Sequence, residues 1–352
     1  MRAELVHFTL VDAGAELDLR RVPLVLGASP AAAPMVSRAP APAYAEFPNP
    51  LEAIQAGPGT GRIEARVHPL GVVTVRLRVV VEAASLQELR LAANGPLWGG
   101  KTLAEAAQPY VDQVLGEVRG ASIEPYSVRS EPERYLAYCI QGENVERLLT
   151  EHAADLAAVV ADEAPGVLVP DRQRSALKHT VRYSHGDAAI LGWDNAILLG
   201  NAGSFEDILD VLELANLELL EFRTYDAYLD QRLDASFETL DRLWAPGGLF
   251  RSARSVLREI SALRVDFARL TDNLHDTGKL FGDWYLATVH QRLHERFHLQ
   301  SWERAVAAKM ETLEDMFHLA EEEANHRRAI FLESMIVVLF ILDLVLIFLT
   351  AK

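Results

Sequence analysis

Several short stretches in the first half of the chain alternate between apolar and polar residues. The clearest alternation places apolar side chains at Val73, Val75, Leu77 and Val79 and polar ones at Thr74, Arg76 and Arg78. Val6, Phe8 and Leu10 repeat the pattern near the N-terminus. A period of two predicts strands with one face against a core. Further strands are expected at 135–140, 179–183, 188–192 and 196–200, and the last two flank the "WDN" of Trp193–Asn195 as a hairpin.

Apolar residues recur with helical spacing at 103–115 and again at 145–160. Strands and helices therefore mix without a regular alternation, which favours an α+β domain over residues 1–204. Within it, residues 30–50 hold six prolines and many alanines. That composition predicts a Pro/Ala-rich loop or linker.

The pattern changes to a heptad after Ser204. Apolar residues occupy alternating steps of four and three at Ile208, Leu212, Ala215, Leu219, Phe222, Leu229, Leu233, Leu240 and Leu243, with Asp226 and Ser236 at the two skipped positions. A second heptad runs from Val256 to Trp284, and the helix that carries it is expected to end near Phe297. A third helix is expected to continue to the C-terminus, because no Pro or Gly interrupts 301–352. Residues 205–328 are therefore predicted to form long antiparallel, coiled-coil-like helices. Asp226 takes an apolar heptad position, where it would set register or partner choice.

The C-terminal residues 329–351 are almost entirely apolar. Fourteen of the fifteen residues from Met335 to Leu349 are strongly apolar, and Asp343 is the exception. A helix of 23 residues would reach about 34 Å, so the sequence predicts a single-pass transmembrane helix. Arg327 and Arg328 precede it, which predicts a soluble domain in the cytoplasm and a location in a bacterial inner membrane. The alternative is a fully buried core helix.

Two acidic residues lie within this apolar run. Glu333 is one turn inside and is expected at an interface. Asp343 is deeper, where a carboxylate costs roughly 2.5–3.5 kcal/mol in a membrane. Three roles remain open for Asp343: a contact between copies of an oligomer, a pore or proton path, or none.

The composition narrows the chemistry. The chain of 352 residues has a formal net charge of −16, so no nucleic-acid partner is expected. Its one cysteine, Cys139, lies in an apolar run and is predicted to be a buried hydrophobe in a reducing compartment. His290, His294 and His298 recur every four residues. Metal binding is one reading, but packed or solvated histidines are the default, so no metal or cofactor is assigned.

Three stretches resemble a known family: "ANLELLEFRTYDAYLD" (215–230), "GDWYLATVHQRLHERFHLQSW" (282–302) and "KMETLEDMFHLAEEEANHRRAIFLESMIVVLFILDLVLIF" (309–348). They are similar to the bacterial branch of the RMD1/RMND1 family, also called the DUF155 domain proteins. The resemblance implies an α+β domain, a helical region, a membrane anchor and assembly into homo-oligomers. It implies no catalytic residues.

These patterns together predict a membrane-anchored, homo-oligomeric scaffold or interaction protein rather than an enzyme. Its expected partners are the lipid bilayer, further copies of itself and an unidentified protein. The alternatives are an oligomeric membrane pore or transport protein built around Asp343, or an enzyme of unknown type in the N-terminal domain.

Overall fold

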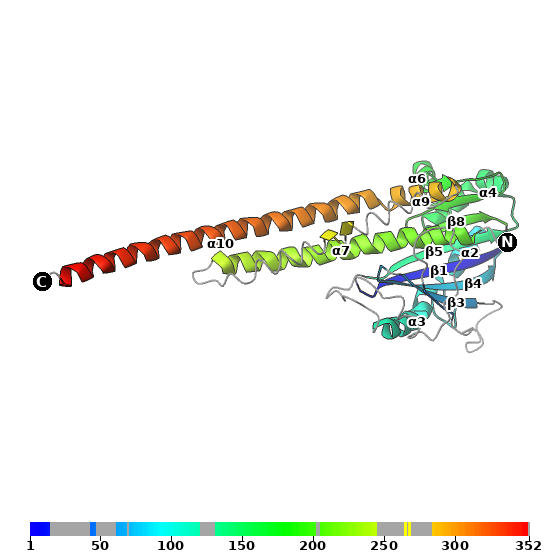
Figure 1. The fold of residues 1–352 in the computed structure, drawn as a ribbon. Coiled ribbons are helices and arrows are strands. Elements are labelled where there is room, and N and C mark those ends of the chain that lie inside the picture. Colours follow the sequence, from blue (N-terminus) through cyan, green and yellow to red (C-terminus); the bar gives the residue numbers. More distant parts are fainter. Residues whose placement is uncertain are drawn as a thin grey trace. The chain divides into compact units, whose positions relative to one another are not determined.

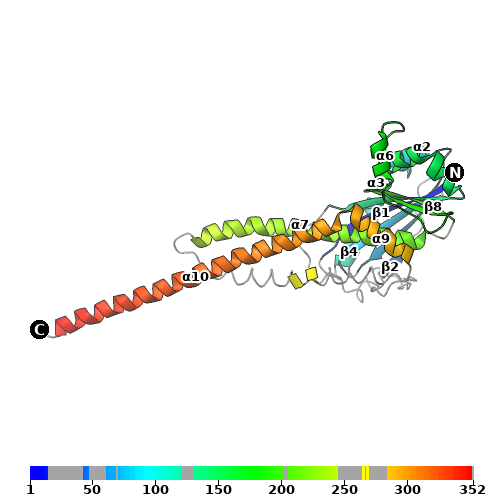
Figure 2. The same cartoon turned by 90° about the horizontal axis from the view of Figure 1, so that it is seen from above.

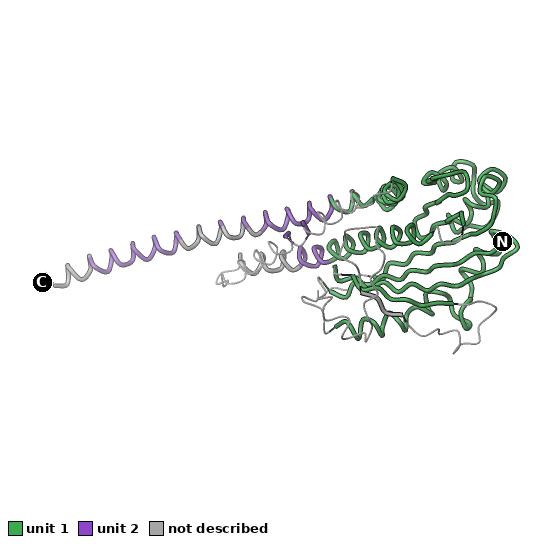
Figure 3. Tube along the Cα trace, turned by 45° about the vertical axis from the view of Figure 1, so that its right-hand side comes forward, with its two compact units in different colours: residues 1–227, 270–303 green, residues 228–269, 304–352 purple. Residues whose placement is uncertain are grey.

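The computed structural model describes residues 1–14, 43–46, 61–68, 70–119, 131–201, 205–244, 264–265, 267–268 and 284–350. Side chains are described for all of these except 43–46, 235–244, 317, 319–321, 323–325, 327–328 and 344–350. The chain divides into two compact units (Figure 3). Unit 1 holds residues 1–227 and 270–303, and unit 2 holds residues 228–269 and 304–352.

Unit 1 is built on one eight-stranded sheet with the order β2-β3-β4-β1-β5-β8-β7-β6. The strands are β1 (Arg2–Asp12), β2 (Ala43–Glu46), β3 (Gly61–Val67), β4 (Val72–Glu82), β5 (Glu133–Gln141), β6 (Thr180–Val181), β7 (Ala188–Leu191) and β8 (Asn195–Gly200). Neighbouring strands are antiparallel, except that β5 and β8 are parallel. β2 lies inside the stretch expected to be a Pro/Ala-rich loop, and the rest of that stretch is outside the described residues.

Helices lie on both faces of this sheet (Figures 1 and 2). The first set is α2 (Leu86–Asn94), α3 (Leu103–Val118), α4 (Val145–Glu151), α5 (Ala153–Val160) and α6 (Pro170–Ala176). Apolar side chains of α2 to α5 form one buried core with alternate residues of the strands, such as Val75, Leu77 and Ile197. The other face is covered by the part of α7 (Glu206–Trp244) that belongs to unit 1, up to residue 227, and by α9 (Trp284–Arg296). Unit 1 is thus a sheet between two helical layers.

Many predicted elements are confirmed. β1 and β4 pair with each other, β7 and β8 form the hairpin around "WDN", and α9 ends at Arg296. The third long helix is α10 (Leu299–Thr350), 52 residues without a break. The second heptad, from Val256 to Trp284, lies almost wholly outside the described residues. The heptad of α7 differs from expectation, because its buried residues Ile208, Leu212 and Leu219 belong to the helical layer over the sheet.

The predicted transmembrane helix is wrong. Over the part of the chain that the structure describes, no helix combines the length and the apolar character needed to cross a membrane. Glu333 and Asp343 interrupt the apolar run of this helix, and the nine residues between them span about 14 Å, against a hydrocarbon core of about 30 Å. The same finding overturns the expected single-pass position in a bacterial inner membrane and the description as a membrane protein.

Unit 2 contains the C-terminal part of α7 and most of α10. Tyr228 and Leu229 are buried in it, together with Val306, Met310 and Leu313 of α10. An ion pair of 2.6 Å joins the Lys309 ammonium to the Asp230 carboxylate. Beyond residue 329 every described side chain of α10 is exposed.

Candidate functional site

Charged side chains gather where α7 crosses the sheet. Arg76 and Arg78 of β4 are polar members of the alternating pattern, yet both are buried, as is Arg66 of the neighbouring strand β3. Their guanidinium groups meet an acidic row on α7 made of Glu206, Asp210 and Glu213, spaced so that one helix face carries all three. Helix α7 therefore packs on the polar face of these strands.

The contacts in this network are short. Asp210 accepts from Arg66 at 2.5 Å and from Arg76 at 2.6 Å, through one carboxylate oxygen. Glu213 accepts from Arg76 and, at 3.1 Å, from Arg66, and its other oxygen lies 2.8 Å from His68 Nε2. Burial opposes ionisation of Glu213, but Arg76 and Arg66 outweigh it and hold the pKa of that carboxyl well below its usual range.

These side chains pair with one another between the helix and the sheet, so their effect is to fix α7 on the sheet. Removing one member of such a pair would leave an uncompensated buried charge, at a cost of about 3–5 kcal/mol. A second link, between Arg223 of α7 and Glu133 of β5, extends the attachment along the helix.

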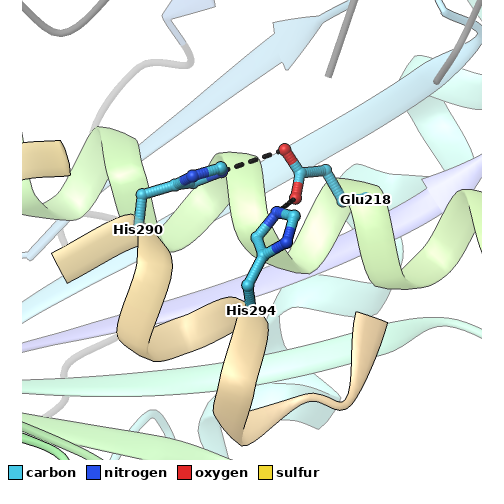
Figure 4. Close-up of side chains that lie close together, drawn as sticks. All are labelled: Glu218, His290 and His294. Atoms are coloured by element: carbon cyan, nitrogen blue, oxygen red, sulfur yellow. Dashed lines mark hydrogen bonds and ion pairs between the residues drawn. The ribbon is translucent and has the colours of Figure 1, made fainter. Parts of the chain in front are cut away.

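A different cluster forms on α7 about one and a half turns beyond Glu213. Glu218 has a fully buried side chain, and two imidazoles of α9 approach it (Figure 4). His290 Nε2 lies 3.0 Å from Glu218 Oε1, and His294 Nε2 lies 2.5 Å from Glu218 Oε2. One ligand-type atom from each residue lies within 4.8 Å of the others.

Apolar packing fixes the helix that carries the histidines. α9 lies beside β6 and β7, and its residues Val289 and Leu293 are fully buried. Phe297 follows the helix and meets the rings of Tyr135 at 5.9 Å and Trp193 at 5.8 Å. A spacing of four residues then puts His290 and His294 on one helix face, with ring centroids 4.5 Å apart.

Charge and burial oppose each other at this cluster. Burial raises the cost of ionising Glu218, but the charges and hydrogen bonds of His290 and His294 prevail and lower the pKa of the carboxyl to about 2. Burial also works against the imidazolium of His290, and the Glu218 carboxylate outweighs it and raises the pKa. The Glu218 carboxylate therefore stays ionised and is stabilised by positive charge on its neighbours.

The other residues singled out from the sequence lie outside this cluster. Asp226 is partly buried in α7, and Glu333 and Asp343 are exposed on α10. The backbones of Arg327 and Arg328 belong to α10, but their side chains are outside the described set. Cys139 is buried in β5, as predicted, and burial raises the pKa of its thiol.

Sequence reasoning found two of the three cluster members and missed the third. The spacing of His290 and His294 was visible, whereas Glu218 is 72 residues before His290. His298, the third histidine of the series, falls at the turn after α9, where its φ is 53°. The available signal was a carboxylate placed between the two apolar residues Leu217 and Leu219 of α7.

Comparison with known proteins identifies a family. The family model described as the N-terminal domain of the uncharacterized protein MJ0711 matches residues 2–206. The chain is 26% identical over 216 residues to the uncharacterized protein MJ0711 of Methanocaldococcus jannaschii, an alignment covering 61% of this chain and 65% of that relative. No solved structure matches the chain. The chain belongs to the MJ0711 N-terminal domain family, a family of uncharacterised proteins, and neither match carries the RMD1 or DUF155 name.

Proposed function

We propose that this member of the MJ0711 N-terminal domain family is a homo-oligomeric scaffold or interaction protein of the RMD1/DUF155 type that acts without catalysis. One observation supports the proposal above the others. The helix α10 displays a long apolar segment whose side chains are exposed in the described part of the chain.

The segment runs from residue 330 to residue 342. Its exposed side chains are Ile330, Phe331, Leu332, Met335, Ile336, Val337, Val338, Leu339, Phe340, Ile341 and Leu342. Their exposed fractions range from 44% at Met335 to 69% at Phe340. Contiguous apolar surface of this kind marks an interaction site in most proteins that carry it.

The distribution of these residues around the helix indicates the kind of partner. Residues 335–342 are all apolar and cover more than two turns, so every side of α10 is apolar there. A helix that is apolar all round is stable when several neighbours surround it. Further copies of the same helix provide such neighbours at the same level, through rotational symmetry.

The charge network on the sheet supports a role without catalysis. Glu213, Arg66 and Arg76 are engaged with one another and hold α7 in place. Such mutual pairing serves the rigidity of unit 1, which suits a domain that presents surfaces to a partner.

The proposal predicts association of the full chain through the α10 segment. Light scattering after size exclusion should give a multiple of the 39.0 kDa chain mass. A triple variant, Ile336→Gln with Leu339→Gln and Phe340→Gln, should shift the mass to that of a single chain. It replaces three exposed side chains, so the fold of unit 1 should keep its melting temperature.

The control introduces glutamine in a polar part of the same helix. Glu311→Gln with Thr312→Gln changes two exposed residues of α10 and should leave the mass unchanged. A wild-type chain that runs as a monomer at 100 μM would refute the proposal. So would a triple variant that associates as strongly as the wild type.

A further inference from the structure

We propose that Glu218, His290 and His294 form a binding site for a divalent first-row transition metal ion, which clamps α9 onto α7. The site lies wholly in unit 1 and is independent of the association proposed for α10. It requires three donors, a suitable geometry, a charge balance and an access route.

The donor set selects the class of ion. Two imidazole nitrogens and one carboxylate oxygen are borderline ligands, the set that Zn²⁺, Fe²⁺, Co²⁺ and Ni²⁺ accept. Ca²⁺ and Mg²⁺ prefer oxygen ligands throughout, and here a single residue would supply them. Figure 4 shows both rings directed at the same carboxylate from one helix face.

The distances are close to those of a coordination shell. Nε2 of His290 and Nε2 of His294 lie 3.0 and 2.5 Å from the two oxygens of Glu218. Donors bound at about 2.0–2.2 Å in a tetrahedral shell are about 3.4 Å apart, so the two nitrogen–oxygen separations would lengthen by roughly 0.4 and 0.9 Å around the ion.

Charge and access are also compatible with a cation. The Glu218 carboxylate is fully buried, and a divalent ion would neutralise it in place of protons on the imidazoles. His294 is 37% exposed, so the fourth coordination position opens toward solvent on its side. An ion can therefore enter, and a water can complete the shell.

The clamp would join segments far apart in the chain. Glu218 and His290 are separated by 72 residues, so the ion would close a long loop. Cross-links of this kind restrict the unfolded chain and stabilise the folded one. Zn²⁺ should therefore raise the melting temperature of the unit that contains the sheet.

The test uses the full chain after dialysis against EDTA. Co²⁺ serves as the probe, because its visible absorption reports nitrogen and oxygen ligands, and Zn²⁺ should displace it. We expect one Co²⁺ per chain and a melting temperature that rises with Zn²⁺ concentration. His294→Gln and, separately, Glu218→Gln should weaken binding by at least about 100-fold, since even outer partners of metal ligands are worth 10–100-fold.

Two controls separate this site from surface histidines. His152→Gln removes a histidine whose side chain is 42% exposed and whose Nδ1 lies 3.2 Å from the Asp155 carboxylate. His298→Gln removes the histidine that follows the cluster at the same spacing. Both should bind Co²⁺ like the wild type.

Several outcomes would overturn the proposal. They are an absence of Co²⁺ absorption, undiminished affinity in His294→Gln, or equal loss in His152→Gln. If Glu218→Gln does not fold, His294→Gln decides, because its partly exposed side chain can be replaced without opening the core.

Discussion

The carboxyl of Asp12, at the end of β1, lies where burial disfavours its ionised form. Burial raises its pKa to about 6, against an ordinary 3.8, even though its side chain accepts a 2.9 Å hydrogen bond from the Gly14 amide. Its charge adds to the burial that raises the pKa of Glu221 on α7. The folded chain therefore binds protons near Asp12 that the unfolded chain has released.

This difference predicts the pH dependence of an Asp12→Asn variant. A folded-state pKa above the unfolded one means that wild-type stability falls as pH rises from about 4 to about 6. The asparagine has no charge to bury and can still accept from Gly14. The variant should match the wild type below pH 4 and exceed it above pH 6, by up to about 3 kcal/mol. Urea unfolding at pH 4 and pH 8 measures this, and equal differences at both values would contradict it.

Single residues also show what the sequence could not disclose. Arg76 and Arg78 sit at the polar positions of an alternating strand, a pattern that usually means solvent. Their burial depends on Asp210 and Glu206, more than 120 residues away. Periodicity reports neighbours two, three or four residues apart, so it predicted the strand and the histidine pair but not their partners on α7.

The β7–β8 hairpin shows how an element is fixed by one small residue. A Cβ on Gly192 would lie 2.6 Å from the Asn195 carbonyl oxygen and 3.1 Å from Val160. The same carbonyl accepts hydrogen bonds from the Gly192 amide at 2.7 Å and the Tyr135 hydroxyl at 2.8 Å. The Asn195 carbonyl therefore links the hairpin to β5, at a point where the backbone approaches Gly192 closely.

Gly192→Ala should destabilise unit 1 by about 2–4 kcal/mol, because backbone atoms must move to admit the methyl group. Gly116→Ala is the matched control. Gly116 lies in α3 with open space around it, so the same change should be neutral or stabilise by up to about 1 kcal/mol. Thermal unfolding of the two variants checks both signs, and a Gly192 variant as stable as the wild type would refute the steric argument.

Elements with a strong local pattern were predicted well, and the long helix was misread in one respect. The absence of Pro and Gly correctly predicted that α10 would continue without interruption through the apolar segment. The membrane assignment rested on the number of consecutive apolar residues, and it is contradicted because no described helix combines the length and the apolar character needed to cross a membrane. A local sequence pattern shows which side chains a helix presents, but not which other parts of the protein pack against them.

At the scale of the whole molecule, net charge opposes the proposed association. Each chain carries a formal charge of −16, so copies repel one another at low ionic strength. The Debye length falls from about 10 Å at 0.1 M salt to about 3 Å at 1 M. Salt should therefore strengthen association through the apolar segment.

Sedimentation velocity at 50 mM and 500 mM NaCl measures this effect. We expect the larger species to gain population at the higher salt concentration. The triple variant of residues 336, 339 and 340 should remain a single chain at both. Dissociation at high salt would instead indicate that ion pairs hold the copies together.

The division of unit 1 between two separate segments has a consequence for synthesis. Synthesis of the sheet and of the first part of α7 is complete when the ribosome has added residue 227, but the segment carrying α9 is complete only at residue 303. At about 5–20 residues per second, that delay is roughly 4–15 s. During it, Tyr135 and the buried carboxylate of Glu218 lack the residues that later cover them. The nascent chain must therefore keep an unfinished surface from misassembly until its own later segment arrives.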